Sequence, residues 1–278
     1  MSLPADSHRR NPGLSPVVRI MTVPVFLVLL IGSLLFIAPG AVAPRWPWVI
    51  PPFNARFLGA IYVAEAVTVA FMLWNNRWSP GRLALVIALL FTVPAATGTL
   101  IHLNQMFWPG KRVAAWFILY FGYIALPAWA LWHYRKLPPV QVLPLPHWPG
   151  RIAVALGAAL LAYGLLMFAI PTQAASFWPW PVDALHGRIY SGIFLSAGAG
   201  LLVSGRGAAR EEVQLTGLAV LTLGGAAVAS LFLASQATGR SIALSAGTMA
   251  WLAVFIALVA VGGTLLAASR DGAALKGE

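Results

Sequence analysis

One acidic side chain, Glu65, lies inside a long apolar stretch, and its position makes it the strongest candidate for chemistry in this sequence. It follows Arg56 on the same predicted helix, and a rise of 1.5 Å per residue places it about 13 Å deeper. A carboxylate at membrane depth is costly unless it is protonated or paired, so such residues commonly serve proton coupling or ligand binding. The structural alternative is a protonated carboxyl that is hydrogen-bonded to a threonine or a carbonyl.

Two histidines, His102 and His186, lie near the ends of apolar stretches. Imidazoles at similar depth on facing helices could form the axial pair of a haem. Together with Asn104 and Asp183 they could instead bind a metal ion, although these residues are scattered along the chain. Solvated histidines at helix ends are the structural alternative, and the sequence leaves the cofactor unknown.

The tripeptide Trp-Pro-Trp occurs twice, and an arginine follows at the same spacing each time: Trp46, Trp48 and Arg56, then Trp178, Trp180 and Arg188. Tryptophan is typical of the headgroup level of a bilayer, which favours an aromatic belt. Alternatively, the two loops form the rim or lid of a ligand pocket. The arginines could reach lipid phosphate, hold loop carbonyls, or bind an anionic ligand group.

The elements that position these residues are predicted to be membrane-spanning helices. The chain has 278 residues, of which 60% are hydrophobic and 9% charged, whereas soluble domains carry about 25% charged residues. A span needs about 20 apolar residues. Such runs occur at 19–38, 55–75, 82–103, 112–134, 151–170, 186–204, 213–236 and 242–268. We therefore expect an all-α integral membrane protein with eight transmembrane helices.

A shift of the chain by 132 residues superimposes windows 19–56 and 151–188 without a gap. The shift aligns the two Trp-Pro-Trp motifs, Gly32 with Gly164, and Arg56 with Arg188. It places Glu65 on Ala197, so the acidic residue is not part of the repeated pattern. The pattern predicts a tandem duplication of a four-helix unit.

Charge and proline content predict the organisation around these repeats. Residues 1–18 are expected to be a disordered cytoplasmic tail, 19–134 and 151–270 the two four-helix repeats, 135–150 a proline-rich cytoplasmic linker, and 271–278 a second cytoplasmic tail. If both termini are cytoplasmic, twelve of the 18 lysines and arginines lie on that side. The positive-inside rule then places the Trp-Pro-Trp loops outside the cell. The net charge of +11 is explained by this distribution, and no nucleic-acid partner is expected.

The segment Ala55-Arg56-Phe57-Leu58-Gly59-Ala60-Ile61-Tyr62, after Trp-Pro-Trp, resembles uncharacterised bacterial multipass membrane proteins. The four-helix unit is also similar to the loosely defined DoxX-type four-helix family. The resemblance covers the first two helices of each half, and the second half departs from it with Gly187-Arg188-Ile189-Tyr190. It implies a location in the bacterial inner membrane and no particular activity.

No nucleotide-binding loop, metalloprotease motif or serine-hydrolase motif is present in the sequence. We therefore expect a membrane protein without enzymatic activity. It would bind a lipid-like or small amphipathic ligand between the halves, or act as an accessory subunit of a membrane complex. Its partners would be the lipid bilayer, another membrane protein or further copies of itself. A proton-coupled secondary transporter that uses Glu65, and a haem- or quinone-linked redox protein, are the alternatives.

Overall fold

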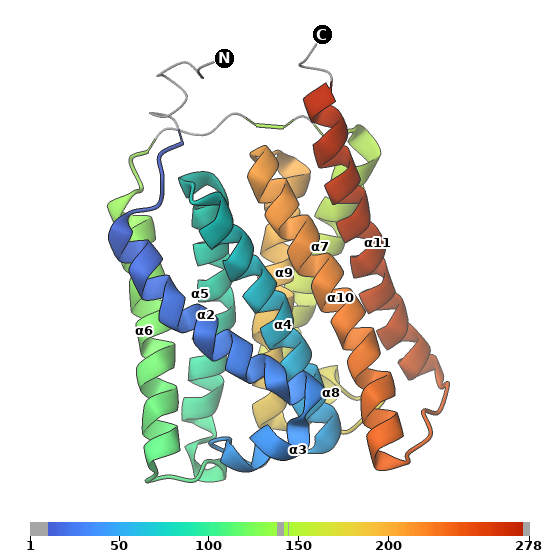
Figure 1. Cartoon of the computed structure of the whole chain (residues 1–278). Coiled ribbons are helices and arrows are strands. Elements are labelled where there is room, and N and C mark those ends of the chain that lie inside the picture. Colours follow the sequence, from blue (N-terminus) through green and yellow to red (C-terminus); the bar gives the residue numbers. More distant parts are fainter. Residues whose placement is uncertain (1–10, 138–141, 144, 275–278) are drawn as a thin grey trace.

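The computed structural model describes residues 11–137, 142–143 and 145–274, and these form an all-helical bundle without a strand (Figure 1). Its eight long helices contain between 22 and 29 residues each. They are α2 (Pro16–Ile37), α4 (Pro52–Asn75), α5 (Trp78–Ile101), α6 (Lys111–His133), α7 (His147–Ala169), α9 (Ala184–Arg206), α10 (Arg210–Thr238) and α11 (Ala246–Ala274). The predicted fold class, an all-α protein of long apolar helices, is confirmed.

Within the described ranges, seven helices are long and apolar enough to cross a membrane, and the exception among the eight is α9. Glycines, serines, His186 and Arg188 lower its hydropathy. Most of its side chains are nevertheless buried, because α7 and α5 pack against it. A helix that protein surrounds on several sides has little contact with lipid, so its polar residues are tolerated.

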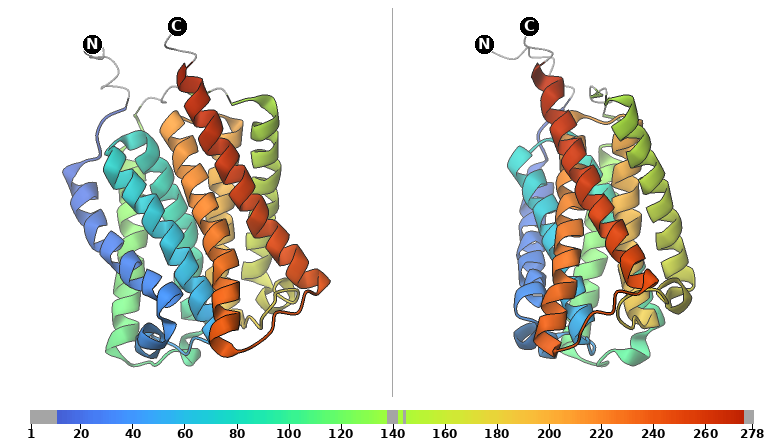
Figure 2. Two further views of the ribbon diagram at one scale, coloured as in Figure 1. Left: turned by 45° about the vertical axis from the view of Figure 1, so that its right-hand side comes forward. Right: turned by 90° about the vertical axis from the view of Figure 1, so that its right-hand side faces the viewer.

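The helices form an inner group of α4, α5, α9 and α10 and an outer group of α2, α6, α7 and α11 (Figures 1 and 2). In each half of the chain the first long helix packs on the second, and the third packs on the fourth. The second helix of each half also packs on the third helix of the other half, α4 on α10 and α9 on α5, and makes few contacts with the third helix of its own half. The two halves are therefore interlocked through their inner helices.

Glycines allow the closest helix contacts. A Cβ at Gly157 on α7 would lie 2.8 Å from the carbonyl oxygen of Gly198 on α9. A Cβ at Gly59 on α4 would lie 2.1 Å from the backbone nitrogen of Phe36 on α2. At both places helix backbones touch, as is typical of packing through small residues in membrane proteins.

Helices α2 and α7 both end in a short second helix, α3 (Pro39–Val42) and α8 (Pro171–Ala174). The junction residues Ala38 and Ile170 have the same backbone angles, φ −130° with ψ 60° and 62°. Proline follows each junction and ends the regular helix, because it lacks the N–H needed to continue the hydrogen-bond ladder. These turns lead into the two Trp-Pro-Trp loops, which lie at the same end of the bundle. We call this end the Trp-Pro-Trp side, and the end where α2 begins the terminus side.

Two predicted boundaries change. The tail was predicted to be disordered to residue 18, but α2 begins at Pro16, capped by Ser15, whose side chain accepts a hydrogen bond from the amide of Val18. The preceding residues are held in place because Leu14 is buried beside Gly81. Residues 1–10 lie outside the described part of the chain.

The linker predicted for 135–150 is shorter, since α7 begins at His147. Its Pro149 occupies the first helical turn, where the missing N–H has no partner to lose. Residues 138–141 and 144 of this linker, and 275–278 of the predicted second tail, are outside the described ranges, whereas 271–274 continue α11. The division into two repeats at 19–134 and 151–270 stays a prediction.

Candidate functional site

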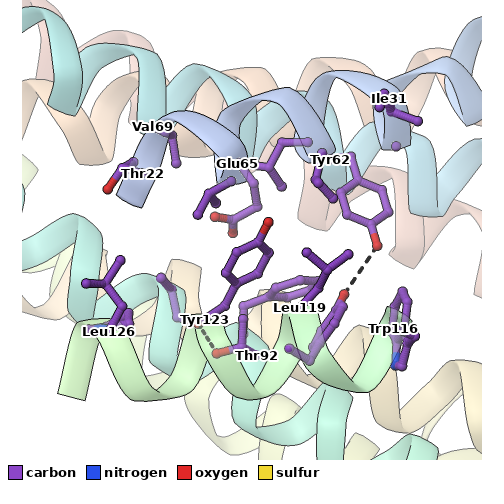
Figure 3. A pocket seen from close by; sticks show the side chains of 18 of the residues that line it. Thr22, Ile31, Tyr62, Glu65, Val69, Thr92, Trp116, Leu119, Tyr123 and Leu126 are labelled. Carbon is purple, nitrogen blue, oxygen red and sulfur yellow. Dashed lines mark hydrogen bonds between the residues drawn. The ribbon is translucent and has the colours of Figure 1, made fainter. Parts of the chain in front are cut away.

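A cavity of about 320 Å³, which we call the main cavity because Glu65 lines it, lies within the first half of the chain (Figure 3). Helices α2, α4, α5 and α6 and the first Trp-Pro-Trp loop line it. Most lining side chains are aliphatic or aromatic. The lining includes the exposed residues Ile31 on α2 and Ala115 on α6, so the cavity opens at the side of the bundle, where lipid would lie. The ligand site was predicted to lie between the halves, but this cavity lies inside one half.

Glu65 extends from α4 into this cavity, and only 7% of its surface is exposed. Its carboxyl group has no hydrogen bond or ion pair to the described residues. Tyr123 on α6 points toward it from the opposite wall (Figure 3), and the Tyr123 hydroxyl is also buried without a partner. Buried polar groups normally find partners, so this unpaired couple is suited to binding a polar group of a ligand.

A second pair of polar groups lies closer to the Trp-Pro-Trp side. The hydroxyls of Tyr62 on α4 and Tyr120 on α6 are 3.2 Å apart and hydrogen-bonded. The ring of Tyr120 stacks on Trp116 at 4.0 Å between centroids. These aromatic side chains form a rigid side wall of the cavity, along the stretch from its deep polar end to its mouth.

At the mouth, Arg45 and Arg112 line the cavity and are exposed. Arg112 donates to the carbonyl of Pro44 at 2.9 Å, and Arg45 donates to the carbonyl of Ala41. One contact each leaves most of the five N–H donors of a guanidinium free. The indole N–H of Trp46, also in the lining, is buried without a partner. The mouth thus presents several donors and two positive charges to a ligand.

Trp48 connects the first loop to the second half of the chain. Its indole N–H donates to Nε2 of His186 at 3.2 Å, and Nδ1 of His186 lies 2.6 Å from Asp183 Oδ2. Asp183 also caps α9 by accepting from the amide of His186 at 2.9 Å. Burial alone would raise the pKa of Asp183, but hydrogen bonds from the side chain and the backbone of His186 lower it to about 2.

The second Trp-Pro-Trp loop makes the corresponding contacts toward the first half. Trp180 donates to the side-chain oxygen of Asn54 at 3.0 Å, and the hydroxyl of Tyr190 donates to the same oxygen at 3.0 Å. Trp178 instead donates within its own half, to the hydroxyl of Tyr163 at 2.6 Å. The interpretation of these loops as a lipid-facing aromatic belt is wrong for Trp48, Trp178 and Trp180, whose rings are buried. These three tryptophans point inward because their rings pack against other aromatic side chains and their N–H groups donate hydrogen bonds within the protein.

The two matching arginines have different roles. Arg56 donates to the carbonyl of Phe36 at 2.7 Å, and so fixes the end of α2 to α4. Nη1 of Arg188 lies 2.7 Å from Nε2 of His102 and 3.4 Å from the carbonyl of Ala184. Partial burial and the positive charge of Arg188 lower the pKa of His102, which keeps the imidazole neutral as an acceptor. Neither arginine lines the main cavity.

His102 and His186 lie on the same side of the bundle but are not arranged as a ligand pair. Both ring nitrogens of each histidine have protein partners: Arg188 and Gln105 for His102, and Trp48 and Asp183 for His186. The described residues contain no group of three or more His, Cys, Asp or Glu that could hold a metal ion. A haem or metal site at these histidines therefore receives no support from this geometry.

Several residues of the site were not singled out from the sequence. Tyr62, Tyr120 and Tyr123 are polar residues within otherwise apolar spans, and this signal could have marked them. Asn54 had no such signal, because it lies at the start of a helix, where polar residues are common. Comparison with known proteins finds no matching family model, no matching characterised protein and no matching solved structure.

Proposed function

We propose that the protein is a membrane protein that binds a small amphipathic ligand, with an anionic head group, in the cavity of its first half. The observation that carries this proposal is the combination of an apolar cavity of about 320 Å³, an unpaired carboxyl at its depth and two arginines at its mouth. Binding pockets for small molecules are typically apolar and contain a few polar groups that set orientation. This geometry favours ligand binding over the alternative of an accessory subunit.

The spacing of the polar groups sets the shape of the ligand. Arg112 and Tyr123 are on the same helix, and their separation along α6 corresponds to about 16 Å at 1.5 Å per residue. An anionic group at Arg45 and Arg112 would form charge-assisted hydrogen bonds. The apolar part would extend past Trp116, and a hydroxyl or carbonyl farther along the ligand would reach Glu65 and Tyr123.

The proposal includes eight spans that arose by tandem duplication of a four-helix unit. The equal backbone angles at Ala38 and Ile170 and the exchanged packing of the inner helices support it. The 132-residue shift then pairs Tyr62 with Phe194 and Glu65 with Ala197. Phe194 and Ala197 are buried apolar residues, so the polar groups of the cavity belong to the first half alone. Such asymmetry is expected when one copy specialises for a ligand and the other for packing.

The proposed location is a bacterial inner membrane, with the terminus side in the cytoplasm and the Trp-Pro-Trp side outside. The unequal distribution of lysine and arginine supports this orientation. It places the arginines of the cavity mouth at the outer leaflet. Accessibility of an introduced cysteine near Val49, which is 70% exposed, tests the orientation in intact cells. Labelling only after the membrane is permeabilised would contradict it.

The test of ligand binding compares two neighbouring residues on α6. Leu119 lines the cavity, whereas Ile118 is 73% exposed on the outer surface. Leu119→Trp should fill the cavity and abolish the ligand that copurifies with the wild-type protein, as measured by native mass spectrometry and lipid extraction. Ile118→Trp is the control and should retain it. If wild type and both variants carry the same bound molecules in the same amounts, the cavity is not the binding site.

A second candidate function is proton-coupled transport, which one observation favours: Glu65 borders a second, smaller cavity between the halves as well as the main one. Carboxyl groups that face internal cavities of membrane proteins commonly mark the proton pathway of a transporter. In proteoliposomes with a pH gradient, Glu65→Gln should then abolish uptake of the molecule identified above. Unchanged uptake by this variant would exclude the coupling role.

A further inference from the structure

Another cavity, of about 530 Å³, lies at the terminus side between the start of α7 and the end of α9. Its volume is within the range of about 300–1,000 Å³ that is typical of sites for small molecules. Three basic side chains line it, His147 and Arg151 on α7 and Arg206 on α9, and all three are exposed. The described residues that line it include no carboxylate, so the cavity carries two positive charges and no negative one. We call it the basic cavity.

The two arginines of the basic cavity lack a protein partner. Neither Arg151 nor Arg206 makes a hydrogen bond or an ion pair with the described residues. The linker residues 135–146 contain no acidic side chain. Arg82, at the same end of the bundle, is by contrast bonded to Glu212. The guanidinium donors that line the basic cavity are therefore available to an anion.

Two glycines bring these arginines to the same cavity. A Cβ at Gly205 on α9 would lie 2.6 Å from the carbonyl oxygen of Gly150 on α7, so the two helix backbones touch at this point. Arg151 and Arg206 directly follow the two glycines in the chain. Larger residues in place of the glycines would hold the helices farther apart and would separate the arginines.

The linker before α7 forms a further wall of the basic cavity. The backbone N–H of Leu143 donates to the carbonyl of Ala208 at 2.8 Å, and this bond holds the linker against the end of α9. Gly207 has φ +112°, a conformation that glycine adopts readily, and a Cβ there would lie 2.9 Å from the side chain of Val142. Val142, Leu143 and Val154 give the cavity apolar walls beside its basic side chains.

The basic cavity lies at the level of lipid head groups. Helix α7 belongs to the outer group and begins at the terminus side of the bundle (Figure 2). Arg151 is in its second turn, about 6 Å along the helix from its start. Trp148, in the first turn, is 61% exposed, as is typical of tryptophan at the head-group level. The cavity therefore opens where the phosphate groups of a lipid leaflet would lie.

We propose that the basic cavity binds the phosphate group of an anionic phospholipid. Arginine suits phosphate because its planar fork forms two parallel charge-assisted hydrogen bonds. Arg151 and Arg206 bind the phosphate oxygens, and His147 supplies one further N–H donor. Basic pockets between membrane helices are typical sites for such head groups.

The apolar walls favour a lipid over a free phosphate ion, which shares the charge but has no apolar part to bury. The glycerol backbone and the first part of the acyl chains would contact these walls. The site belongs to the second half of the chain and does not depend on the ligand proposed for the main cavity.

The experiment is a titration of delipidated protein in neutral detergent with short-chain phosphatidylglycerol, followed by native mass spectrometry. Every protein carries Leu119→Trp, which fills the main cavity, so that the probe does not bind at the arginines there. If Leu119→Trp prevents folding, Arg45→Gln with Arg112→Gln replaces it. Arg151→Gln with Arg206→Gln should weaken binding about tenfold or more, because both charge-assisted contacts are lost. Diacylglycerol with the same chains, which lacks the phosphate, should bind equally with and without these two substitutions.

Arg19→Gln with Arg270→Gln is the matched control. Both arginines are exposed, on α2 and α11 at the terminus side, and they line none of the cavities described above. This pair removes the same charge and should leave the affinity within about twofold at 0.15 M salt, which screens exposed charges away from the site. Arg151→Lys with Arg206→Lys keeps the charge but loses the fork, so its affinity should be intermediate.

Three results would overturn the proposal. One is equal weakening by the two glutamine pairs, which would show that net charge alone attracts the lipid. Another is unchanged affinity of the variant that lacks both arginines of the basic cavity. The third is displacement of the lipid by an equal concentration of inorganic phosphate, which would assign the cavity to a soluble anion. Because the main cavity is blocked throughout, failure of the ligand proposed there does not affect this result.

Discussion

The indole N–H of Trp48 donates a hydrogen bond to Nε2 of His186, although 138 residues separate them in the chain. This bond joins the first Trp-Pro-Trp loop to the helix that follows the second one. Trp180 and Asn54 make a similar link in the opposite direction. The two loops therefore hold the halves together at one end of the bundle, while Arg82 and Glu212 do so at the other.

The Asp183–His186 contact predicts a dependence of stability on pH. The folded-state pKa of Asp183 is about 2, below its ordinary value of 3.8. Its carboxylate therefore stabilises the fold above pH 4, and this contribution is lost as the pH falls from about 4 to about 2. In detergent, the melting temperature of wild type should exceed that of Asp183→Asn at neutral pH, and the two should converge over this window. A constant difference down to pH 2 would contradict the assignment.

The ion pair between the partly exposed Arg82 and the buried Glu212 predicts an unequal response to mutation. Arg82→Ala leaves the fully buried Glu212 carboxylate without its partner, which should cost about 1–3 kcal/mol of stability, less than for a fully buried pair because solvent screens the half-exposed Arg82. The double variant Arg82→Ala with Glu212→Gln should recover part of this loss, because the unpaired charge is removed. The measurement is the free energy of unfolding in detergent.

Arg151→Ala is the control for this pair, since Arg151 is exposed on α7. Its effect should be within about 0.5 kcal/mol of wild type. Equal losses for Arg82→Ala and Arg151→Ala would show that the ion pair is not important for stability.

The contact between α7 and α9 predicts a strong effect of one methyl group. A Cβ at Gly157 would lie 2.8 Å from the carbonyl oxygen of Gly198 and 3.0 Å from the amide of Leu202. Gly157→Ala should therefore destabilise the protein by about 1–3 kcal/mol through overpacking. Gly225→Ala on α10 is the comparison, because no atom lies within 4 Å of its Cβ. Alanine has a greater helix propensity than glycine, so the melting temperature of Gly225→Ala should equal that of wild type or be slightly higher. A drop for Gly225→Ala as large as that for Gly157→Ala would argue against the close contact.

The sequence by itself determined the helices and the position of Glu65 inside an apolar run. Hydropathy and helix length are local properties, so runs of apolar residues predict all-helical structure and the approximate start and end of each helix. Helices α2 and α7 begin a few residues earlier than predicted. Ser15 caps α2, and proline is tolerated in the first turn of α7. The sequence also marked Glu65 as unusual, because a carboxyl group inside an apolar run is costly wherever the helix faces.

Only the tertiary structure decided which helices are neighbours and which way their side chains point. In a membrane protein both lipid-facing and buried positions are apolar, so hydropathy does not distinguish the two faces of a helix. The inward direction of Trp48 and Trp180 depends on hydrogen-bond partners in the other half of the chain. Trp178 bonds to Tyr163 in its own half and contacts the ring of Phe57 in the other half. The cavity depends on the separation of α2 from α6 around Glu65, and no local pattern fixes the distance between these two helices. Contacts between residues far apart in the chain are not encoded in any local pattern, and such contacts bring the tyrosines of α6 and the hydroxyl groups of the second half close to Glu65.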